Sequence, residues 1–266
     1  MSVSQVPWKE IGKVILELYE VYHIKNSLSV QERYEQQIKY FEQLLGMVRN
    51  VDANLIKEYI DARAPINAIL AGIQAKVKKE LEELLEVKGV DLKITPASSF
   101  TAGTNLMHES DIDFNVPVKN LNTETLVLLA NLCGTKGYRF TGALSTDNPG
   151  IYYVFYQVIQ EGEIKIEIEV KIRHAEVYEK IHSKMHEYLD NEMTAEDKAT
   201  VTWIKHNLSK EKKYYKAFKA LYYEYALAKA GVYEMIYPLT GGGRTRRKHK
   251  SVSKSRDNAQ LFVRKR

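Results

Sequence analysis

The sequence contains a single cysteine and no long apolar run. Cys133 cannot form an internal disulfide on its own, and one thiol without a nearby Cys or His cluster does not indicate a zinc site. Because it lies in the apolar run of residues 126–133, we expect it to be a buried structural thiol. No apolar stretch reaches the roughly 18 residues of a membrane-spanning helix, and residues 1–8 lack the features of a secretory signal. We therefore expect an intracellular protein of the cytoplasm or nucleus, without a membrane partner.

Positive charge is concentrated at one end of the chain. The 266 residues carry a formal net charge of +5, but residues 241–266 alone hold ten Lys or Arg and only one acid, Asp257. The rest of the chain is therefore close to neutral. Three consecutive glycines followed by basic residues predict a disordered tail over residues 238–266 that attracts phosphate groups. Such a tail favours RNA as a partner, because neutralising several phosphates strengthens binding.

The hydrophobic pattern divides the chain into helices, a small sheet and further helices. Residues 1–89 repeat apolar side chains at three- and four-residue steps, which predicts amphipathic helices, the third of them opening at Pro65. Residues 90–173 alternate like strands around one crossover helix, and residues 174–237 return to a helical pattern. The predicted fold class is thus α+β, a small mixed sheet with helices before it and a helical second lobe after it.

The predicted strands are bounded by turn residues. Two of them are expected to stop at Pro96 and Pro117. The other two, residues 151–159 and 163–172, are separated by a predicted tight hairpin. The chemistry is expected in this sheet, because its strands carry the most informative polar residues.

Two aspartates, Asp111 and Asp113, are two positions apart on a predicted strand, so both side chains point to the same face. Ile112 and Phe114 point the other way, into apolar surroundings. Two carboxylates held side by side repel each other by on the order of a few kcal/mol, and a cation between or beside them removes that cost. Oxygen ligands suit Mg²⁺ or Mn²⁺, which also bind substrate phosphates. The alternative is an acidic turn without a metal.

The loop before these acids fits a phosphate-bearing ligand. Ser99 offers a hydroxyl and a backbone N–H to a phosphate, and Gly103 allows backbone and ligand to approach closely. A loop of Ser, Gly and Asp residues is common, so each half of the pattern is weak by itself. The two halves in this order, between two predicted strands, are more specific.

This segment resembles the motif of the DNA polymerase beta-type nucleotidyltransferase superfamily. That group includes poly(A) polymerases, CCA-adding enzymes, and oligoadenylate and cyclic-dinucleotide synthases. Its pattern is Gly-Ser, a turn with Gly-Thr or Gly-Ser, and then Ser-Asp-hydrophobic-Asp on the next strand. The residues that match it here are Ser99, Gly103, Thr104, Ser110, Asp111 and Asp113. Ser98 stands where the family has its first glycine, which adds strain if that turn needs a positive φ. The resemblance covers about twenty residues.

The resemblance implies a third carboxylate on a later strand. Glu167 and Glu169 share one face of a predicted strand, so periodicity leaves both open. The family's acid is often followed by a few residues that finish the strand, which favours Glu169. The alternative is that both are solvated residues paired with Lys165 and Lys171.

The implied reaction is two-metal phosphoryl transfer from an NTP, with ATP the expected nucleotide. One ion would bind Asp111 and Asp113, and the other would also contact the third acid. The resemblance further implies that a Lys from the helical lobe contacts the triphosphate while an aromatic residue stacks on the base. Five lysines lie among aromatic residues in that lobe, Lys205, Lys212, Lys213, Lys216 and Lys219. Core packing is the alternative explanation for the aromatic residues.

Three classes of function remain open. The first is template-independent extension of an RNA 3′ end, as in polyadenylation, which the basic tail favours. The second is synthesis of an oligoadenylate or a cyclic dinucleotide, and the third is a nucleotide- or RNA-binding relative without activity. We favour the first. The tail also resembles the Gly-then-Arg/Lys extensions of some proteins of large DNA viruses, which points to a viral origin. The sequence does not indicate protein partners.

Overall fold

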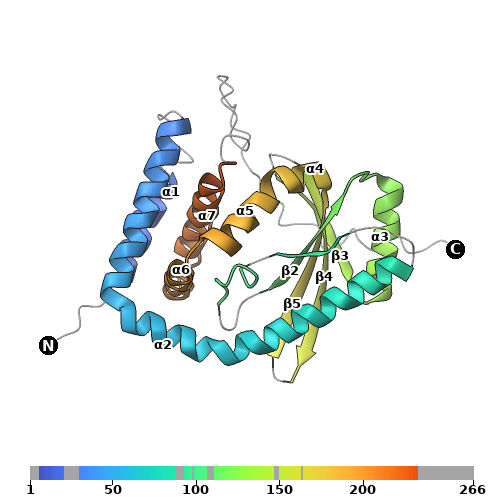
Figure 1. Cartoon of the computed structure of the whole chain (residues 1–266), viewed down its shortest axis with the longest axis horizontal. Coiled ribbons are helices and arrows are strands. Elements are labelled where there is room, and N and C mark those ends of the chain that lie inside the picture. Colours follow the sequence, from blue (N-terminus) through green and yellow to red (C-terminus); the bar gives the residue numbers. More distant parts are fainter. Residues whose placement is uncertain are drawn as a thin grey trace.

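The computed structural model confirms the α+β class, with long helices before a five-stranded mixed sheet and a helical region after it. It describes residues 6–20, 30–87, 93–97, 99–106, 111–146, 150–162 and 164–232. Two helices come first, α1 (Trp8–Glu20) and α2 (Val30–Val87). Figure 1 shows α2 passing from the helical group on the left to the sheet on the right, so that one helix connects the two parts.

The sheet has the strand order β1-β2-β5-β4-β3. The central strands β2 (Ile112–Val118) and β5 (Ile164–His174) are parallel, and the other pairs are antiparallel. The remaining strands are β1 (Thr95–Ala97), β3 (Arg139–Thr146) and β4 (Gly150–Glu161). Both expected longer strands are therefore present, as β4 and β5. The parallel contact brings together strands that are distant in the sequence, and α3 (Thr123–Thr135) lies between them in the chain.

One face of the sheet is apolar and packs against α3 and the second half of α2. Ile112 and Phe114 of β2 are fully buried, as is Ile168 of β5. Burying a side chain of this size contributes roughly 1.5–3 kcal/mol, and a one-residue slip would expose the whole set. The same apolar cluster includes residues of both helices, Leu70, Ile73, Val77, Leu81, Leu85, Leu129, Leu132 and Cys133. Cys133 is buried, as the sequence predicts.

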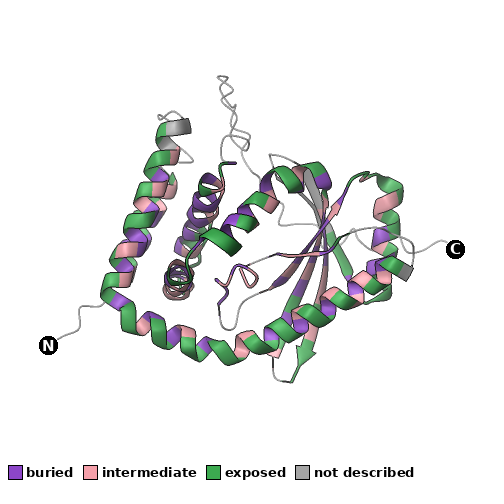
Figure 2. Cartoon of the chain, viewed as in Figure 1, coloured by how far each residue is buried: buried purple, intermediate pink, exposed green. Residues whose placement is uncertain are grey.

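The second apolar cluster joins α1 and the first half of α2 to the helices that follow the sheet. The later helices that contribute to it are α5 (Lys184–Glu187), η3 (Tyr188–Glu192), α6 (Ala195–Leu208) and α7 (Lys212–Lys229). The short segments α4 (Ala175–Val177) and η2 (Tyr178–Ser183) connect β5 to these helices. Helices α1 and α7 approach closely at Gly12, where an added Cβ would lie 2.5 Å from the Tyr214 ring. Figure 2 shows buried residues along α7 and along one side of α2. The long helix α2 thus contributes to both cores.

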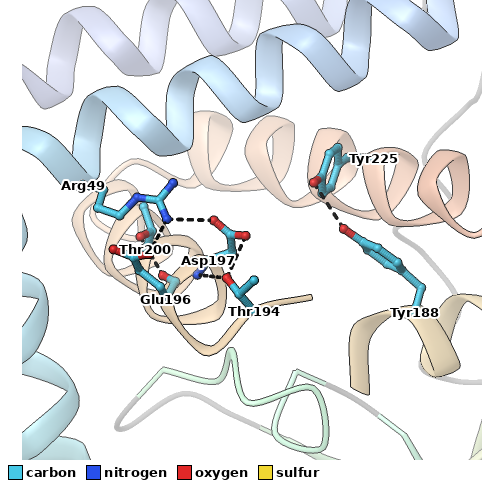
Figure 3. Close-up of polar contacts among 7 residues, drawn as sticks. All are labelled: Arg49, Tyr188, Thr194, Glu196, Asp197, Thr200 and Tyr225. Carbon is cyan, nitrogen blue, oxygen red and sulfur yellow. Dashed lines mark hydrogen bonds and ion pairs between the residues drawn. The ribbon is translucent and has the colours of Figure 1, made fainter. Parts of the chain in front are cut away.

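Polar contacts surround the start of α6, where this helix lies next to α2 (Figure 3). Arg49 of α2 lies 2.8 Å from Glu196 and 3.3 Å from Asp197. Thr194 caps α6, because its hydroxyl accepts a hydrogen bond from the Asp197 N–H at 3.0 Å. Partly exposed ion pairs such as those of Arg49 contribute little stability, about 0–1 kcal/mol each. The cap therefore stabilises the first turn of α6, and the apolar cluster holds the helix in place.

Three expectations about prolines are wrong in detail. Pro65 does not open a third helix, because α2 runs through it and departs from helical geometry only at Asp52. Pro65 is exposed, so water can bond the carbonyl that loses its helical donor. Pro96 lies within β1, an edge strand, where a missing N–H is tolerated. Pro117 lies within β2, beyond the last residue that pairs with β1.

The helices of the described residues include none that is both long enough and apolar enough to span a membrane.

Candidate active site

The polar face of the sheet gathers the acids that the sequence singles out. Asp113 on β2 lies directly opposite Glu169 on β5 in the parallel register. Asp111 immediately precedes β2, and by the same register it lies level with Glu167. The buried Ile and Phe residues between these acids fix which face they occupy. Four carboxylates from two neighbouring strands therefore share one face.

Burial and neighbouring charges shift the pKa values of both aspartates upward. Burial raises the pKa of Asp111 to about 6, and repulsion from Asp113, Glu167 and Glu169 adds to the shift. Burial also raises the pKa of Asp113 above its usual value, despite the attraction of a neighbouring lysine, Lys171. A carboxylate whose charge is unfavourable in the folded protein favours binding of either a proton or a cation. These two acids are therefore suited to a cationic ligand.

Lys171 lies between two of the acids. Its Nζ atom is 3.1 Å from Oδ2 of Asp113 and 3.1 Å from Oε2 of Glu169. Burial alone would lower the pKa of Lys171, but the two carboxylates and their hydrogen bonds outweigh it, so the pKa is raised. The lysine is therefore charged at neutral pH. The ion pair between Glu169 and Lys171 that the alternative expected is therefore formed, but its two side chains are partly buried rather than solvated.

The other oxygen of Asp113 has no protein partner. Its Oδ1 atom is buried and lacks a hydrogen bond among the described residues. A buried, charged oxygen without a partner is costly, so it marks a position where a ligand would be stabilising. The described residues contain no group of three or more His, Cys, Asp or Glu side chains arranged to hold one metal ion. Lys171 lies between two of these carboxylates, those of Asp113 and Glu169.

Residues of β4 and α7 surround the acids. The Tyr156 hydroxyl donates a hydrogen bond to Glu167, which raises the pKa of that tyrosine. From α7, the charge of Lys219 favours the ionised forms of both Asp111 and Asp113. Lys219 is exposed, and its ammonium lies 5.8 Å from the centre of the Tyr223 ring. Lys219 is therefore a cation near the acids that remains accessible to a ligand.

The loop before the acids forms a tight turn. The Thr104 N–H donates to the Ser99 carbonyl at 2.7 Å, and the Gly103 N–H donates to the Phe100 carbonyl at 2.9 Å. Gly103 has a φ of +72°, a conformation that glycine adopts without steric cost. Ser99 and Gly103 are half-buried, whereas Thr104 is fully buried. The Thr104 hydroxyl lies 3.4 Å from the Ser99 carbonyl, so it supports the turn from within.

Two buried cations hold three consecutive carbonyls of this loop. Arg63 of α2 donates to the Gly103 carbonyl at 3.1 Å and to the Asn105 carbonyl at 2.5 Å. Lys205 of α6 donates to the Thr104 carbonyl at 2.5 Å. Burial lowers the pKa of Lys205 to about 7, and repulsion from other cations adds to the shift. The loop is thus fastened to helices on either side of it.

The predicted site residues divide into three groups. Asp111, Asp113, Glu167 and Glu169 come together on one face of the sheet. Ser99, Gly103 and Thr104 form the neighbouring turn, where Thr104 has a structural position. Ser98 and Ser110 lie outside the described residues, as does the predicted basic tail.

Sequence reasoning did not identify the roles of three cations. Lys205 was expected among the lysines that contact a triphosphate, but it is 2% exposed and bonded to the loop. Arg63 was not singled out, although it falls on the apolar side of α2 between Tyr59 and Ile66, where a charge signals a specific partner. Lys171 was considered only as a surface counter-ion. Its place on the same strand face as Glu169 was the available signal.

The chain also has a small apolar cavity, but it lies on the opposite face of the sheet. Residues of α2, α3, β2 and β5 line it, including Leu81, Leu129 and Val170. With only apolar walls, it offers no group for chemistry and is a packing gap. No family model matches this chain, and a search of curated proteins finds no significant relative.

Proposed function

We propose that this protein is a metal-dependent nucleotidyltransferase that transfers NMP from an NTP to a hydroxyl acceptor. One observation carries the proposal: Asp111, Asp113, Glu167 and Glu169 share one face of two adjacent parallel strands. The turn formed by Ser99 and Gly103 precedes them, as the resemblance to DNA polymerase beta-type nucleotidyltransferases implies.

The residues present fit a divalent cation beside the aspartates. Asp111 would supply a carboxylate with a raised pKa, and Asp113 would supply its unpartnered Oδ1. Hard oxygen ligands of this kind suit Mg²⁺ or Mn²⁺. When bound, such an ion neutralises charge on the triphosphate and on the departing pyrophosphate. We expect Lys219 to attract the same triphosphate, because it is exposed and within electrostatic reach of both aspartates.

The transfer forms one bond and breaks another. The acceptor oxygen bonds to the α-phosphorus of the NTP, the bond between that phosphorus and the α–β bridging oxygen breaks, and pyrophosphate leaves. The acceptor hydroxyl loses its proton to a base, either a carboxylate of this acidic face or bulk water. Glu169 is the favoured third acid, because it lies directly opposite Asp113. Glu167 is the second choice, since it lies two positions farther along β5 from the residue opposite Asp113.

The proposed acceptor is the 3′ end of an RNA, extended without a template and with ATP as the nucleotide. Residues 241–266 hold ten Lys or Arg against one acid, a composition that favours a polyphosphate partner. The turn and the acids alone do not discriminate among acceptors. The acceptor is therefore the part of this proposal that depends on the tail.

The test uses the full-length chain with each NTP, Mg²⁺ or Mn²⁺, and a short RNA. A ladder of extended RNA supports the proposal, whereas phosphatase-resistant small products without RNA would indicate oligoadenylate or cyclic-dinucleotide synthesis. No product with any NTP and metal would contradict nucleotidyl transfer. Asp113→Asn should abolish the product while leaving the circular dichroism spectrum unchanged. Glu161→Gln, at the exposed end of β4, is the matched control and should retain turnover.

A second candidate function is nucleotide binding without turnover. The specific observation that favours it is Lys171, which already neutralises part of the charge on Asp113 and Glu169. Calorimetric titration with ATP would support this candidate if binding occurs while every NTP remains intact after long incubation. Detectable transfer would contradict it.

A further inference from the structure

The position between Asp113 and Glu169 contains a positive charge supplied by the chain itself. The Lys171 ammonium is 3.1 Å from an oxygen of each carboxylate, and all three side chains are largely shielded from water. Side-chain exposures of 19% for Lys171, 17% for Asp113 and 30% for Glu169 show that the lysine is not a freely solvated surface residue. The register explains this placement, because Lys171 follows Glu169 by two positions and so points to the same face.

A divalent ion bridging the same two carboxylates would need the same space. Mg²⁺ requires oxygen ligands at about 2.1 Å in nearly octahedral geometry. An ammonium within hydrogen-bonding distance of Asp113 and Glu169 blocks that geometry, and two cations this close repel each other strongly. The two carboxylate oxygens of Asp113 therefore have different surroundings. Oδ2 contacts Lys171, and Oδ1 is buried without a partner among the described residues.

We propose that Lys171 is a resident cation that takes the place of a divalent ion between Asp113 and Glu169. A catalytic role for Lys171 rests on the proposed nucleotidyl transfer. In that reaction the chain would need one divalent ion, held by Asp111 and Oδ1 of Asp113, and Lys171 would supply the second positive charge. Glu169 would then be a positioning residue that holds the lysine.

The test measures how many Mn²⁺ ions the full-length chain binds, by electron paramagnetic resonance of free Mn²⁺ without nucleotide. Lys171→Met should bind one ion more than the wild-type chain, because Asp113 and Glu169 then lose their cation and can share a metal. Lys165→Met is the matched control, an exposed lysine on the same strand and face, and should leave the number unchanged. Equal numbers in Lys171→Met and wild type would overturn the proposal.

Variants at Glu169 provide a check that does not depend on how well Lys171→Met folds. In the wild-type background, Glu169→Gln should leave the number of Mn²⁺ ions unchanged, because Glu169 binds the lysine. Loss of one ion in that variant would overturn the proposal. In the Lys171→Met background, Glu169→Gln should weaken the additional ion by about tenfold or more. If Glu169→Gln leaves the affinity for the additional Mn²⁺ ion unchanged in that background, the proposal is also overturned.

This measurement separates the inference from the proposed function. If Lys171→Met gains an ion but no NTP is ever transferred, the resident cation is supported and the transferase proposal fails. If NMP is transferred from NTP but wild type and Lys171→Met bind the same number of Mn²⁺ ions, the transferase proposal stands and the proposed role of Lys171 is wrong.

Discussion

Asp113 lies directly opposite Glu169 in the register of the parallel strands β2 and β5. Lys171 lies between the two side chains and forms an ion pair with each of them. It also makes the two glutamates of β5 unequal, although both point to the same face. Glu169 is half-buried beside Lys171, whereas Glu167 is exposed and interacts with Tyr156.

The first prediction concerns this inequality. Glu169→Gln should lower the rate of nucleotidyl transfer by about 10–100-fold, because it disturbs the charges next to Asp113. Glu167→Gln should change the rate by less than about threefold, since that carboxylate lies farther from Asp113. Initial rates of product formation at saturating NTP measure both effects. A larger loss in Glu167→Gln would assign the third acid to that residue instead.

The second prediction concerns the stability cost of Asp111. Its pKa is raised to about 6 from an ordinary value of 3.8, so the folded chain binds more protons than the unfolded chain between these pH values. The stabilisation by the protonated form is complete below pH 3.8 and is lost as the pH rises through about 6. Asp111→Asn avoids this loss and should raise the free energy of unfolding at pH 7 by about 1–2 kcal/mol, a value reduced for partial exposure.

Urea denaturation in the presence of EDTA measures this gain, with Glu161→Gln as the control. That exposed substitution should change stability by less than about 0.5 kcal/mol. A less stable Asp111→Asn protein would show that the carboxylate has a stabilising partner. Gain of stability together with loss of activity is the pattern expected of a functional acid.

The third prediction concerns Lys205 and pH. The folded-state pKa of about 7 lies below the ordinary value of 10.5, so between these values the unfolded chain binds more protons than the folded chain. The contribution of Lys205 to stability therefore rises with pH from about 7 to 10, by at most about 1.4 kcal/mol per pH unit. In Lys205→Met that contribution is absent.

The measurement is the difference in free energy of unfolding between wild type and Lys205→Met across this pH range. The difference should move in favour of the wild type as the pH rises. Lys212→Met, at the exposed start of α7, should run parallel to wild type. A difference that does not vary with pH would show that Lys205 keeps its ordinary pKa despite its burial.

The fourth prediction concerns the close approach of α1 and α7. Gly12→Ala places a Cβ 2.5 Å from the Tyr214 ring, and overpacking of this kind costs about 1–3 kcal/mol. Gly72→Ala is the matched control, because it lies in α2 with nothing within 4 Å of the added carbon. It should stabilise the chain by about 0.5–1 kcal/mol through helix propensity. Thermal unfolding of both variants measures the opposite shifts, and a stabilised Gly12→Ala protein would contradict the packing described for α1.

Local patterns in the sequence were sufficient to predict the kinds of element and the faces of the strands. Alternation of Ile112 and Phe114 with the aspartates set the polar face, because a strand repeats every two residues. The same reasoning placed Glu167 and Glu169 on one face of β5. The prediction that a helix begins at Pro65 failed, because α2 continues through this exposed proline. The apolar core holds the turns on either side of it, so the local effect of the proline does not end the helix.

The sequence by itself thus determined the α+β class, the strand faces and the acids worth testing. The tertiary structure alone decided which acid lies opposite Asp113, that Lys171 stands between the two, and that Arg63 and Lys205 fasten the loop. The physical reason is that the alternation of apolar and polar side chains depends only on neighbouring positions, because every second residue of a strand points to the same face. Strand register and the burial of a charge depend on contacts between segments far apart in the chain, and only the packed fold specifies those.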